Sequence, residues 1–180
     1  MYSKLTTATA HTDEFCCLDS KTAETHDPCQ CEARRAKYEH DLRLAYCAGL
    51  FDGDGCIIIS KQWQPGRKNA SYRLTLSLVQ NCNYTINHFR KVLDVQDCLV
   101  EVRRKAQHNR QVYDLRFDGL HAVAVLKLLS PYLVRKAIEA GVALDFWTAG
   151  SMGVLPGRNG LDPDVWVKRE KFFRKMKKLK

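Results

Sequence analysis

The sequence has no long hydrophobic run, and no stretch approaches the roughly 20 apolar residues that a membrane-spanning helix needs. The beginning of the chain also lacks the apolar segment of a secretory signal peptide. Residues 1–10 are rich in Ser and Thr, and the acidic residues Asp13 and Glu14 follow at once. We therefore expect a protein that acts inside the cell, with no membrane as its partner.

The eight cysteines lack the spacing of a structural zinc site. Such sites usually combine a C-x₂₋₄-C pair with a second pair of ligands, whereas residues 16–31 offer Cys16-Cys17 and Cys29-x-Cys31. The other four cysteines stand singly in apolar or patterned segments, as reduced cysteines do: Cys47, Cys56, Cys82 and Cys98. Ordinary thiols are therefore expected, and zinc in the N-terminal arm is not.

Positive charge dominates, with a formal net charge of +9, and it is unevenly distributed. Residues 1–40 carry 5 Lys/Arg against 7 Asp/Glu, residues 41–167 carry 16 against 12, and residues 168–180 carry 8 against 1. A basic body with a strongly basic end suits a polyanionic partner, because each neutralised phosphate releases a counterion. Charge alone fits a soluble protein with a solvated basic tail equally well.

Hydrophobic periodicity predicts an α+β domain at residues 39–167. Helices are predicted at 41–51, 85–93, 120–129, 131–147 and from 164, and strands at 56–63, 71–79, 99–105 and 111–117. This order favours an antiparallel sheet. Residues 1–38 show no sustained period and predict a poorly ordered arm with a short helix near 31–39. Residues 168–180 predict a basic C-terminal helix or tail.

Residues 47–55, Cys-Ala-Gly-Leu-Phe-Asp-Gly-Asp-Gly, resemble the nine-residue LAGLIDADG signature, with Cys for its first Leu and Gly for its central Ala. The predicted elements that follow are similar to those of the family over residues 41–150. They include a strand that ends in Gln80 and a Pro-Tyr-Leu-x-x-Lys segment at 131–136. The resemblance implies the αββαββα homing-endonuclease fold, an antiparallel saddle with helices on one face. It also implies site-specific cleavage of double-stranded DNA.

Small side chains lie on the motif helix at Ala45, Ala48, Gly49 and Gly53. A face of small side chains lets two helix backbones approach closely. The sequence holds one copy of the motif and no internal repeat, so the packing partner has to be a second chain related by a two-fold axis. We therefore expect a homodimer that binds a long pseudo-palindromic site.

Asp54 ends the predicted motif helix, so two-fold packing would place two Asp54 carboxylates side by side. They would repel each other unless divalent cations lay between them, and such cations can activate water for phosphodiester hydrolysis. The resemblance makes Asp54 the ligand of Mg²⁺ (or Mn²⁺), with the backbone carbonyl of Gly53 beside it. The alternative is a plain helix end and tight turn at Gly55. Asp52 is a weaker candidate than Asp54, and a role in shaping the turn is its alternative.

The resemblance adds two catalytic candidates. Gln80 lies where members of the family position solvent near the metal, and Lys136 lies where a basic residue stabilises the charge that develops on the scissile phosphate. The alternatives are a polar strand end for Gln80 and a solvated helix lysine for Lys136, with Arg135 in its place if the helix register differs by one. One departure stands out, because residues 81–85 contain no Arg where some members carry one.

The outward side chains of a four-stranded sheet can lie in the major groove, where each base pair presents a distinct hydrogen-bonding pattern. Every soluble sheet exposes polar residues, so this pattern alone does not show that any one of these residues contacts DNA. The candidate DNA-binding residues are Ser60, Gln62, Gln64, Arg67, Ser71, Arg73, Thr75, Ser77, Arg103, Lys105 and Arg116. Residues 168–180 would add phosphate contacts that are independent of sequence.

Two other classes of protein remain open. A relative of the family can act as an RNA maturase or as a non-cleaving nucleic-acid-binding protein, although a binder does not need the motif acid Asp54. An unrelated protein that shares the Asp-Gly-Asp-Gly segment by chance would not explain the ordered match of the later elements.

Overall fold

The computed structural model describes residues 28–63, 65–66, 69–95, 99–104, 111–150, 152 and 162–180, without the side chains of 28–30 and 99–104. The chain divides into two compact units, Met1–His40 and Asp41–Lys180. The described part of the first unit is the beginning of helix α1 (Pro28–Asp54), where Arg35 and Glu39 form an exposed ion pair at 3.5 Å.

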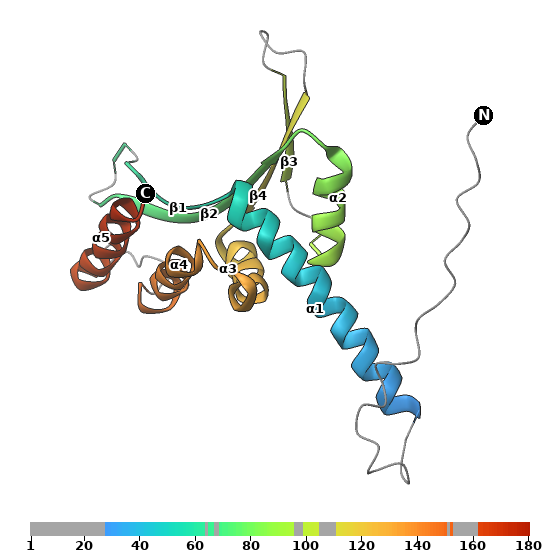
Figure 1. Ribbon diagram of the computed structural model, residues 1–180. Helices are drawn as coiled ribbons and strands as arrows, with labels where there is room; N and C mark the ends of the chain where they lie inside the picture. The colour runs from blue at the N-terminus through green and yellow to red at the C-terminus, as the bar shows by residue number, and fades with distance from the viewer. Residues whose placement is uncertain are drawn as a thin grey trace. The chain divides into compact units, whose positions relative to one another are not determined.

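The second unit has the mixed α+β composition that the sequence predicts. After the end of α1 come β1 (Gly55–Gln62), β2 (Ser71–Gln80), α2 (Asn83–Val92), β3 (Leu99–Arg104), β4 (Gln111–Asp118), α3 (Gly119–Leu129), the 3-10 turn η1 (Ser130–Tyr132), α4 (Ala137–Ala149) and α5 (Pro163–Lys178). Figure 1 shows the sheet as a curved layer with α2, α3, α4 and α5 on the same side. Among the described residues, no helix is long and apolar enough to cross a bilayer.

The four strands form an antiparallel sheet in the order β1-β2-β4-β3. Side chains alternate between the two faces of a strand, and the helix-covered face of β2 carries the buried residues Tyr72, Leu74, Leu76 and Leu78. The predicted alternation of residues 71–79 is therefore confirmed. The register places Ser60 opposite Arg73 and Ser77 opposite Arg116 on the other, outer face.

The end of α1 is fixed in the hydrophobic core. Leu44 is 5 % exposed, while Cys47, Ala48 and Phe51 are fully buried, and the ring of Phe51 lies 6.5 Å from that of Phe89 in α2. Burial raises the pKa of the Cys47 thiol to about 11, because the apolar surroundings disfavour the thiolate. The last turns of α1 therefore have a fixed orientation relative to the sheet.

Two predicted helices differ in extent from the observed ones. The short helix predicted near 31–39 is confirmed, but it begins at Pro28 and continues into α1, because Ala, Arg, Lys and Glu in this segment are good helix formers even without an apolar period. Residues 1–27 lie outside the described part of the chain. The helix predicted at 131–147 is interrupted: Leu133 has an extended backbone after η1, and α4 begins only at Ala137.

The helix predicted from residue 164 is confirmed as α5, and the basic residues 168–178 form its later part. The helix begins at Pro163 behind the N-cap Asp162, whose side chain accepts a hydrogen bond from the Asp164 backbone at 2.9 Å. It packs on the covered face of the sheet because apolar residues recur along it, and Met176 is 2 % exposed. The basic segment is thus an integral part of the domain.

Glu170 is the main polar link between α5 and the sheet. Its carboxylate accepts hydrogen bonds from Lys61 Nζ at 2.8 Å, from Arg174 Nε at 2.9 Å and from the Tyr72 hydroxyl. The hydrogen bond from Lys61, followed by that from Tyr72, lowers the pKa of Glu170 to about 2. Lys61 also lies within 6.0 Å of four aromatic ring centres, including that of Trp166 in α5.

Candidate functional site

The end of α1 lies beside the end of β2, where Asp54 and Gln80 meet. The β1–β2 register pairs Gly55 with Leu78, so the residues that precede β1 lie close to those that end β2. Gln80 Nε2 donates a hydrogen bond of 2.5 Å to Asp54 Oδ2, and the Asp54 side chain is exposed. Two of the three predicted catalytic residues are therefore in direct contact.

Asp52 holds the turn between η1 and α4 against the end of α1. Its Oδ2 accepts hydrogen bonds from the backbone N–H groups of Val134 at 2.7 Å and Arg135 at 3.0 Å, and its Oδ1 accepts one from Lys136 at 3.0 Å. Burial opposes the ionisation of Asp52, but the three N–H donors and the nearby Lys136 charge outweigh it and lower the pKa. This carboxylate explains why the helix predicted at 131–147 is interrupted.

Lys136 lies at this turn and is nearly buried, with 4 % of its surface exposed. Its Nζ donates a hydrogen bond to the backbone carbonyl of Asp52, so the ammonium caps the end of α1. Desolvation lowers the pKa of Lys136, and the neighbouring Arg135 charge adds to this effect. The structure thus places Lys136 against Asp52, two residues before Asp54 in α1, as a buried cap and not as the solvated helix lysine of the alternative interpretation.

Arg135 is the exposed cation of the same turn. Its Nη2 donates a hydrogen bond of 3.2 Å to the backbone carbonyl of Gly53, the predicted partner of Asp54 in metal binding. From the sequence, Arg135 is expected only as a substitute for Lys136. Its contact with Gly53 depends on the turn that Asp52 binds, and no motif in the sequence indicates that turn.

The chemistry of the donors fits Mg²⁺ or Mn²⁺, because an exposed carboxylate and a backbone carbonyl are hard oxygen ligands. One chain supplies few such oxygen ligands. Over the described residues there is no group of three or more His, Cys, Asp or Glu side chains that could hold a metal ion. A metal bound at Asp54 and Gly53 therefore needs ligands from water, from DNA or from a second copy of the chain.

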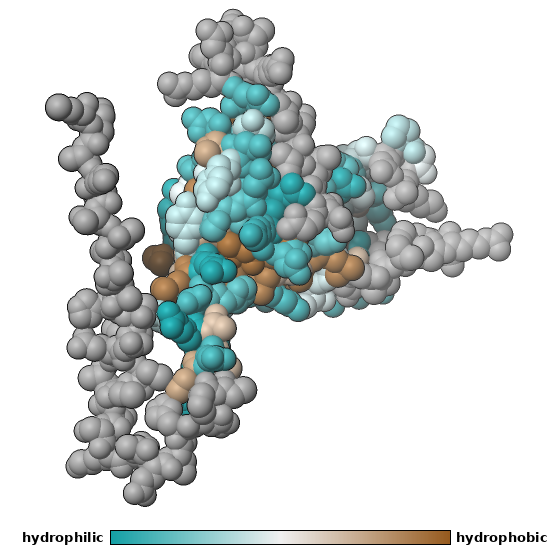
Figure 2. Space-filling model, turned by 90° about the vertical axis from the view of Figure 1, so that its right-hand side faces the viewer, coloured by the Kyte–Doolittle hydropathy of each residue, from teal (hydrophilic) through white to brown (hydrophobic). Residues whose placement is uncertain are grey.

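The outward face of α1 combines small residues with exposed apolar ones. Ala45, Gly49 and Gly53 are exposed, and a Cβ atom added at either glycine would meet nothing within 4 Å. Leu42 and Tyr46 on the same helix are 53 % and 57 % exposed. Figure 2 shows hydrophobic surface gathered in a band across the middle of the face that it presents, with hydrophilic surface around it.

The turn that Asp52 binds adds further apolar surface, because Val134 is 86 % and Ile138 68 % exposed. Ala48 does not belong to the outward face, and its assignment to the dimer interface was wrong. It is fully buried in the core with Leu44 and Phe51, the neighbours at helical spacing.

The outer face of the sheet carries the expected polar residues, but acidic residues accompany them. Thr75 donates a hydrogen bond of 2.5 Å to Asp118, and Arg73 forms an ion pair with Asp118 at 3.9 Å. Ser77 and Arg116 both donate to the buried Asp114, each at 2.8 Å. These four candidate DNA-binding residues therefore have partners within the protein, and nothing in the sequence pattern predicts the role of Asp118.

The other candidates for DNA contact divide into two groups. The Ser60 and Ser71 hydroxyls donate to the backbone carbonyls of Arg73 at 3.4 Å and Gln62 at 3.2 Å, and the Gln62 side chain is exposed. The second group lies outside the description: Gln64, Arg67 and Lys105 as whole residues, and Arg103 as a side chain.

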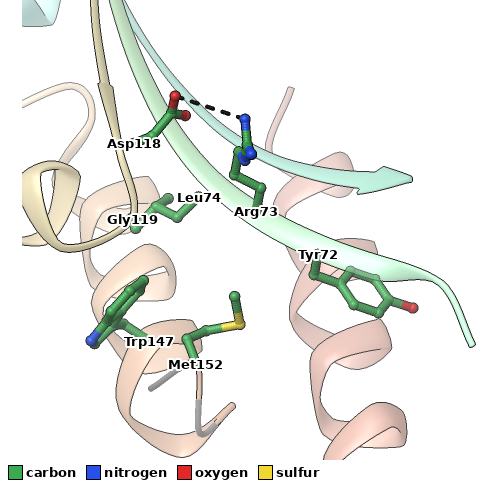
Figure 3. Close-up of a pocket in the computed structure, with 7 residues that line it drawn as sticks. All are labelled: Tyr72, Arg73, Leu74, Asp118, Gly119, Trp147 and Met152. Atoms are coloured by element: carbon green, nitrogen blue, oxygen red, sulfur yellow. Dashed lines mark ion pairs between the residues drawn. The ribbon is translucent and has the colours of Figure 1, made fainter. Parts of the chain in front are cut away.

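A shallow pocket of about 360 Å³ opens where β4 passes into α3. In Figure 3 the Arg73–Asp118 ion pair lies on one side of it and Trp147 and Met152 lie on the other. It contains none of the residues at the end of α1; its lining is formed by Tyr72, Arg73, Leu74, Asp118, Gly119, Trp147 and Met152. The pocket is therefore separate from the Asp54–Gln80 pair.

Comparison with solved structures identifies the fold. The homing endonuclease I-CvuI, in complex with the I-CreI target in 2 mM Mg and with its DNA uncleaved, aligns with a TM-score of 0.62 and 22% identity over 79% of this chain and 85% of that one. The chain has the LAGLIDADG homing-endonuclease fold. This fold fits the order of its elements and the helix-covered sheet described above.

Two further structures with this fold are more distant in sequence. The archaeal intron-encoded homing endonuclease I-Vdi141I, complexed with DNA, aligns with a TM-score of 0.59 and 14% identity over 78% of this chain and 85% of that one. The LAGLIDADG homing endonuclease I-LtrWI, bound to target DNA, aligns with a TM-score of 0.53 and 16% identity over 72% of this chain and 42% of that one. No protein-family model and no curated protein sequence matches the chain.

Proposed function

We propose that this protein is a site-specific double-strand DNA endonuclease that hydrolyses phosphodiesters with a divalent metal ion and acts as a homodimer. The observation that carries the proposal is the contact between Asp54 and Gln80 at the exposed end of α1. The Asp54 carboxylate is exposed beside this polar strand end, where a metal ion can reach it. Solved structures with this fold include complexes with DNA.

The outward face of α1 supports the homodimer. A second copy packed on Ala45, Gly49 and Gly53 through a two-fold axis would cover the adjacent exposed side chains of Leu42 and Val134. It would also bring two Asp54 carboxylates together, which supplies the ligands that one chain lacks. The dimer and the metal site thus depend on the same surface.

Each residue at the end of α1 has a role in the proposed reaction. Asp54 and the carbonyl of Gly53 would hold Mg²⁺ or Mn²⁺, and the bound ion would supply an activated water and neutralise charge on the scissile phosphate. The Gln80 amide, now bonded to Asp54, can orient that water through its own carbonyl and N–H groups. Lys136 and Asp52 fix the end of α1 against the η1–α4 turn, so that Asp54 keeps its orientation.

The outer face of the sheet is the proposed DNA-reading surface. Arg73 is exposed and its partner Asp118 lies 3.9 Å away, so the guanidinium can exchange this weak ion pair for a base edge or a phosphate. Asp114 and Asp118 offset the charge of Arg73 and Arg116, so non-specific attraction has to come mainly from other parts of the chain, such as the exposed lysines of α5.

The test is a cleavage assay with three proteins. Wild type, Asp54→Asn and the matched control Asp145→Asn, an exposed carboxylate on α4, are incubated with a pooled library of double-stranded DNA and Mg²⁺, and the cut ends are sequenced. We expect wild type and Asp145→Asn to cut both strands at one near-palindromic sequence, leaving short 3′ overhangs. Asp54→Asn should bind the same sequence without cutting it.

A different result would favour the second candidate function, an RNA maturase or a non-cleaving nucleic-acid-binding protein. The absence of Arg from residues 81–85 and the engagement of Lys136 by Asp52 are the observations that favour it. If no protein cuts, but wild type and Asp54→Asn bind one DNA or RNA sequence with the same affinity, the endonuclease proposal is refuted.

A further inference from the structure

Both oxygen atoms assigned to the metal already accept hydrogen bonds from other residues of the chain. Gln80 Nε2 donates to Asp54 Oδ2 at 2.5 Å, and Arg135 Nη2 donates to the carbonyl oxygen of Gly53 at 3.2 Å. The first donor is a neutral amide, whereas the second belongs to a permanent cation. A positively charged group therefore lies at the position where a divalent cation would bind.

The two basic residues of the turn are not equivalent. Lys136 is 4 % exposed, and its Nζ is committed to the carbonyl of Asp52. Arg135 is exposed: the Asp52 carboxylate holds its backbone N–H at 3.0 Å, whereas its side chain is held at the longer distance of 3.2 Å by the Gly53 carbonyl. The Arg135 side chain can therefore leave Gly53 without disturbing the turn, whereas Lys136 cannot leave Asp52 without exposing an uncapped helix end.

We propose that Arg135 occupies the Gly53 carbonyl in the metal-free protein, is displaced when the divalent metal binds, and then binds the phosphate beside that metal. This inference rests on the proposed function, because it requires a metal at Asp54 and a phosphate next to it. The guanidinium and the metal compete for one carbonyl oxygen and repel each other, so both cannot occupy it.

The displaced guanidinium remains within reach of the reaction. Its Cα is held by the contact between Asp52 and the Arg135 backbone, so the side chain pivots about a fixed point next to Gly53 and Asp54. A guanidinium presents a planar fork of N–H donors that matches two phosphate oxygens. Arg135 thereby supplies an arginine to a site in which residues 81–85 contain none.

Metal binding in the absence of DNA tests the displacement directly. Mn²⁺ is titrated into wild type, Arg135→Ala and the control Lys127→Ala, which removes an exposed charge from α3, and free Mn²⁺ is followed by electron paramagnetic resonance. We expect Arg135→Ala to bind Mn²⁺ about five- to tenfold more tightly than wild type, because one charged hydrogen bond no longer has to be broken. Lys127→Ala should match wild type.

Single-turnover cleavage at saturating Mn²⁺ tests the phosphate contact. Arg135→Ala should cut at least about tenfold more slowly than wild type, with partial recovery in Arg135→Lys, because one charge-assisted contact to the phosphate is lost and a lysine restores the charge without the fork. The same variant thus gains affinity for the metal and loses rate, a combination that simple damage to the fold does not produce.

The outcomes separate this inference from the proposed function. Equal or weaker Mn²⁺ binding by Arg135→Ala, in a preparation whose wild type cuts DNA, overturns the displacement alone. An unchanged cleavage rate overturns the phosphate contact. If wild type neither binds Mn²⁺ nor cuts any DNA, the metal-dependent endonuclease itself is refuted, and the role of Arg135 falls with it.

Discussion

Replacement of Gly49 by Ala should have opposite effects on the folded chain and on its dimer. Gly49 lies inside α1, it is exposed, and an added Cβ would meet nothing within 4 Å. In a helix interior, Ala is more favourable than Gly by about 0.8–1.0 kcal/mol. A chain that remains a monomer should therefore gain about 1 kcal/mol in its free energy of unfolding.

If two α1 helices cross at Gly49, the same substitution should destabilise the dimer. The substitution then adds one methyl group from each copy at the point where the backbones approach most closely. We expect the dimer dissociation constant to rise at least about tenfold, which corresponds to about 1.4 kcal/mol. Gly49→Leu should abolish the dimer while leaving the circular dichroism of the monomer unchanged.

Gly141 provides the matched control, because it is an exposed glycine inside α4 whose added Cβ also meets nothing within 4 Å. Sedimentation equilibrium measures the dimer, and urea unfolding below the dissociation constant measures the monomer. Gly141→Ala should stabilise the monomer by about 1 kcal/mol and leave dimerisation unchanged. If Gly49→Ala behaves like Gly141→Ala in both assays, the α1 helices do not form the interface.

Two further predictions concern the polar links of the domain. Asp52→Ala should lower the free energy of unfolding by about 2–4 kcal/mol, because it leaves three backbone N–H groups without their acceptor; a loss below about 0.5 kcal/mol in urea unfolding would contradict this. Glu170→Gln should lower the free energy of unfolding by about 2–3 kcal/mol at pH 7. The reason is that the pKa of Glu170 is lowered from 4.5 to about 2, first by the hydrogen bond from Lys61. Folding thus releases a proton between pH 2 and pH 4.5. The difference in free energy of unfolding between wild type and Glu170→Gln should therefore shrink as pH falls from 4.5 towards 2. A difference that does not depend on pH would refute the role of the ionised Glu170 carboxylate.

The strands and their faces could be predicted because they depend on local pattern. Alternation from Tyr72 to Leu78 indicates which side of β2 faces the core, whatever covers it. The proximity of Asp54 and Gln80 followed from the order of the elements that resembles the family. The first prediction required only sequence spacing, whereas the second rested on the resemblance and agrees with the antiparallel β1–β2 pairing.

The predictions that failed depend on contacts between distant parts of the chain. Ala48 is as small as Ala45, and only the position of the sheet decides that Ala48 is buried while Ala45 is exposed. The interruption before α4 arises because Asp52 binds the backbone of residues 134–136, and the sequence of that segment alone does not predict this contact. The acidic partner Asp118 becomes visible only once the β2–β4 register pairs it with Thr75.

The most direct measurement uses a dimer made of one wild-type copy and one Asp54→Asn copy, purified with two different affinity tags. Its DNA is the sequence recovered from the cleavage library, labelled separately on each strand. If each copy supplies one Asp54 to a shared pair of sites, the mixed dimer should nick the DNA and the Asp54→Asn homodimer should only bind it. Cleavage of both strands by the mixed dimer at the wild-type rate would contradict a site that is completed by two copies of the chain.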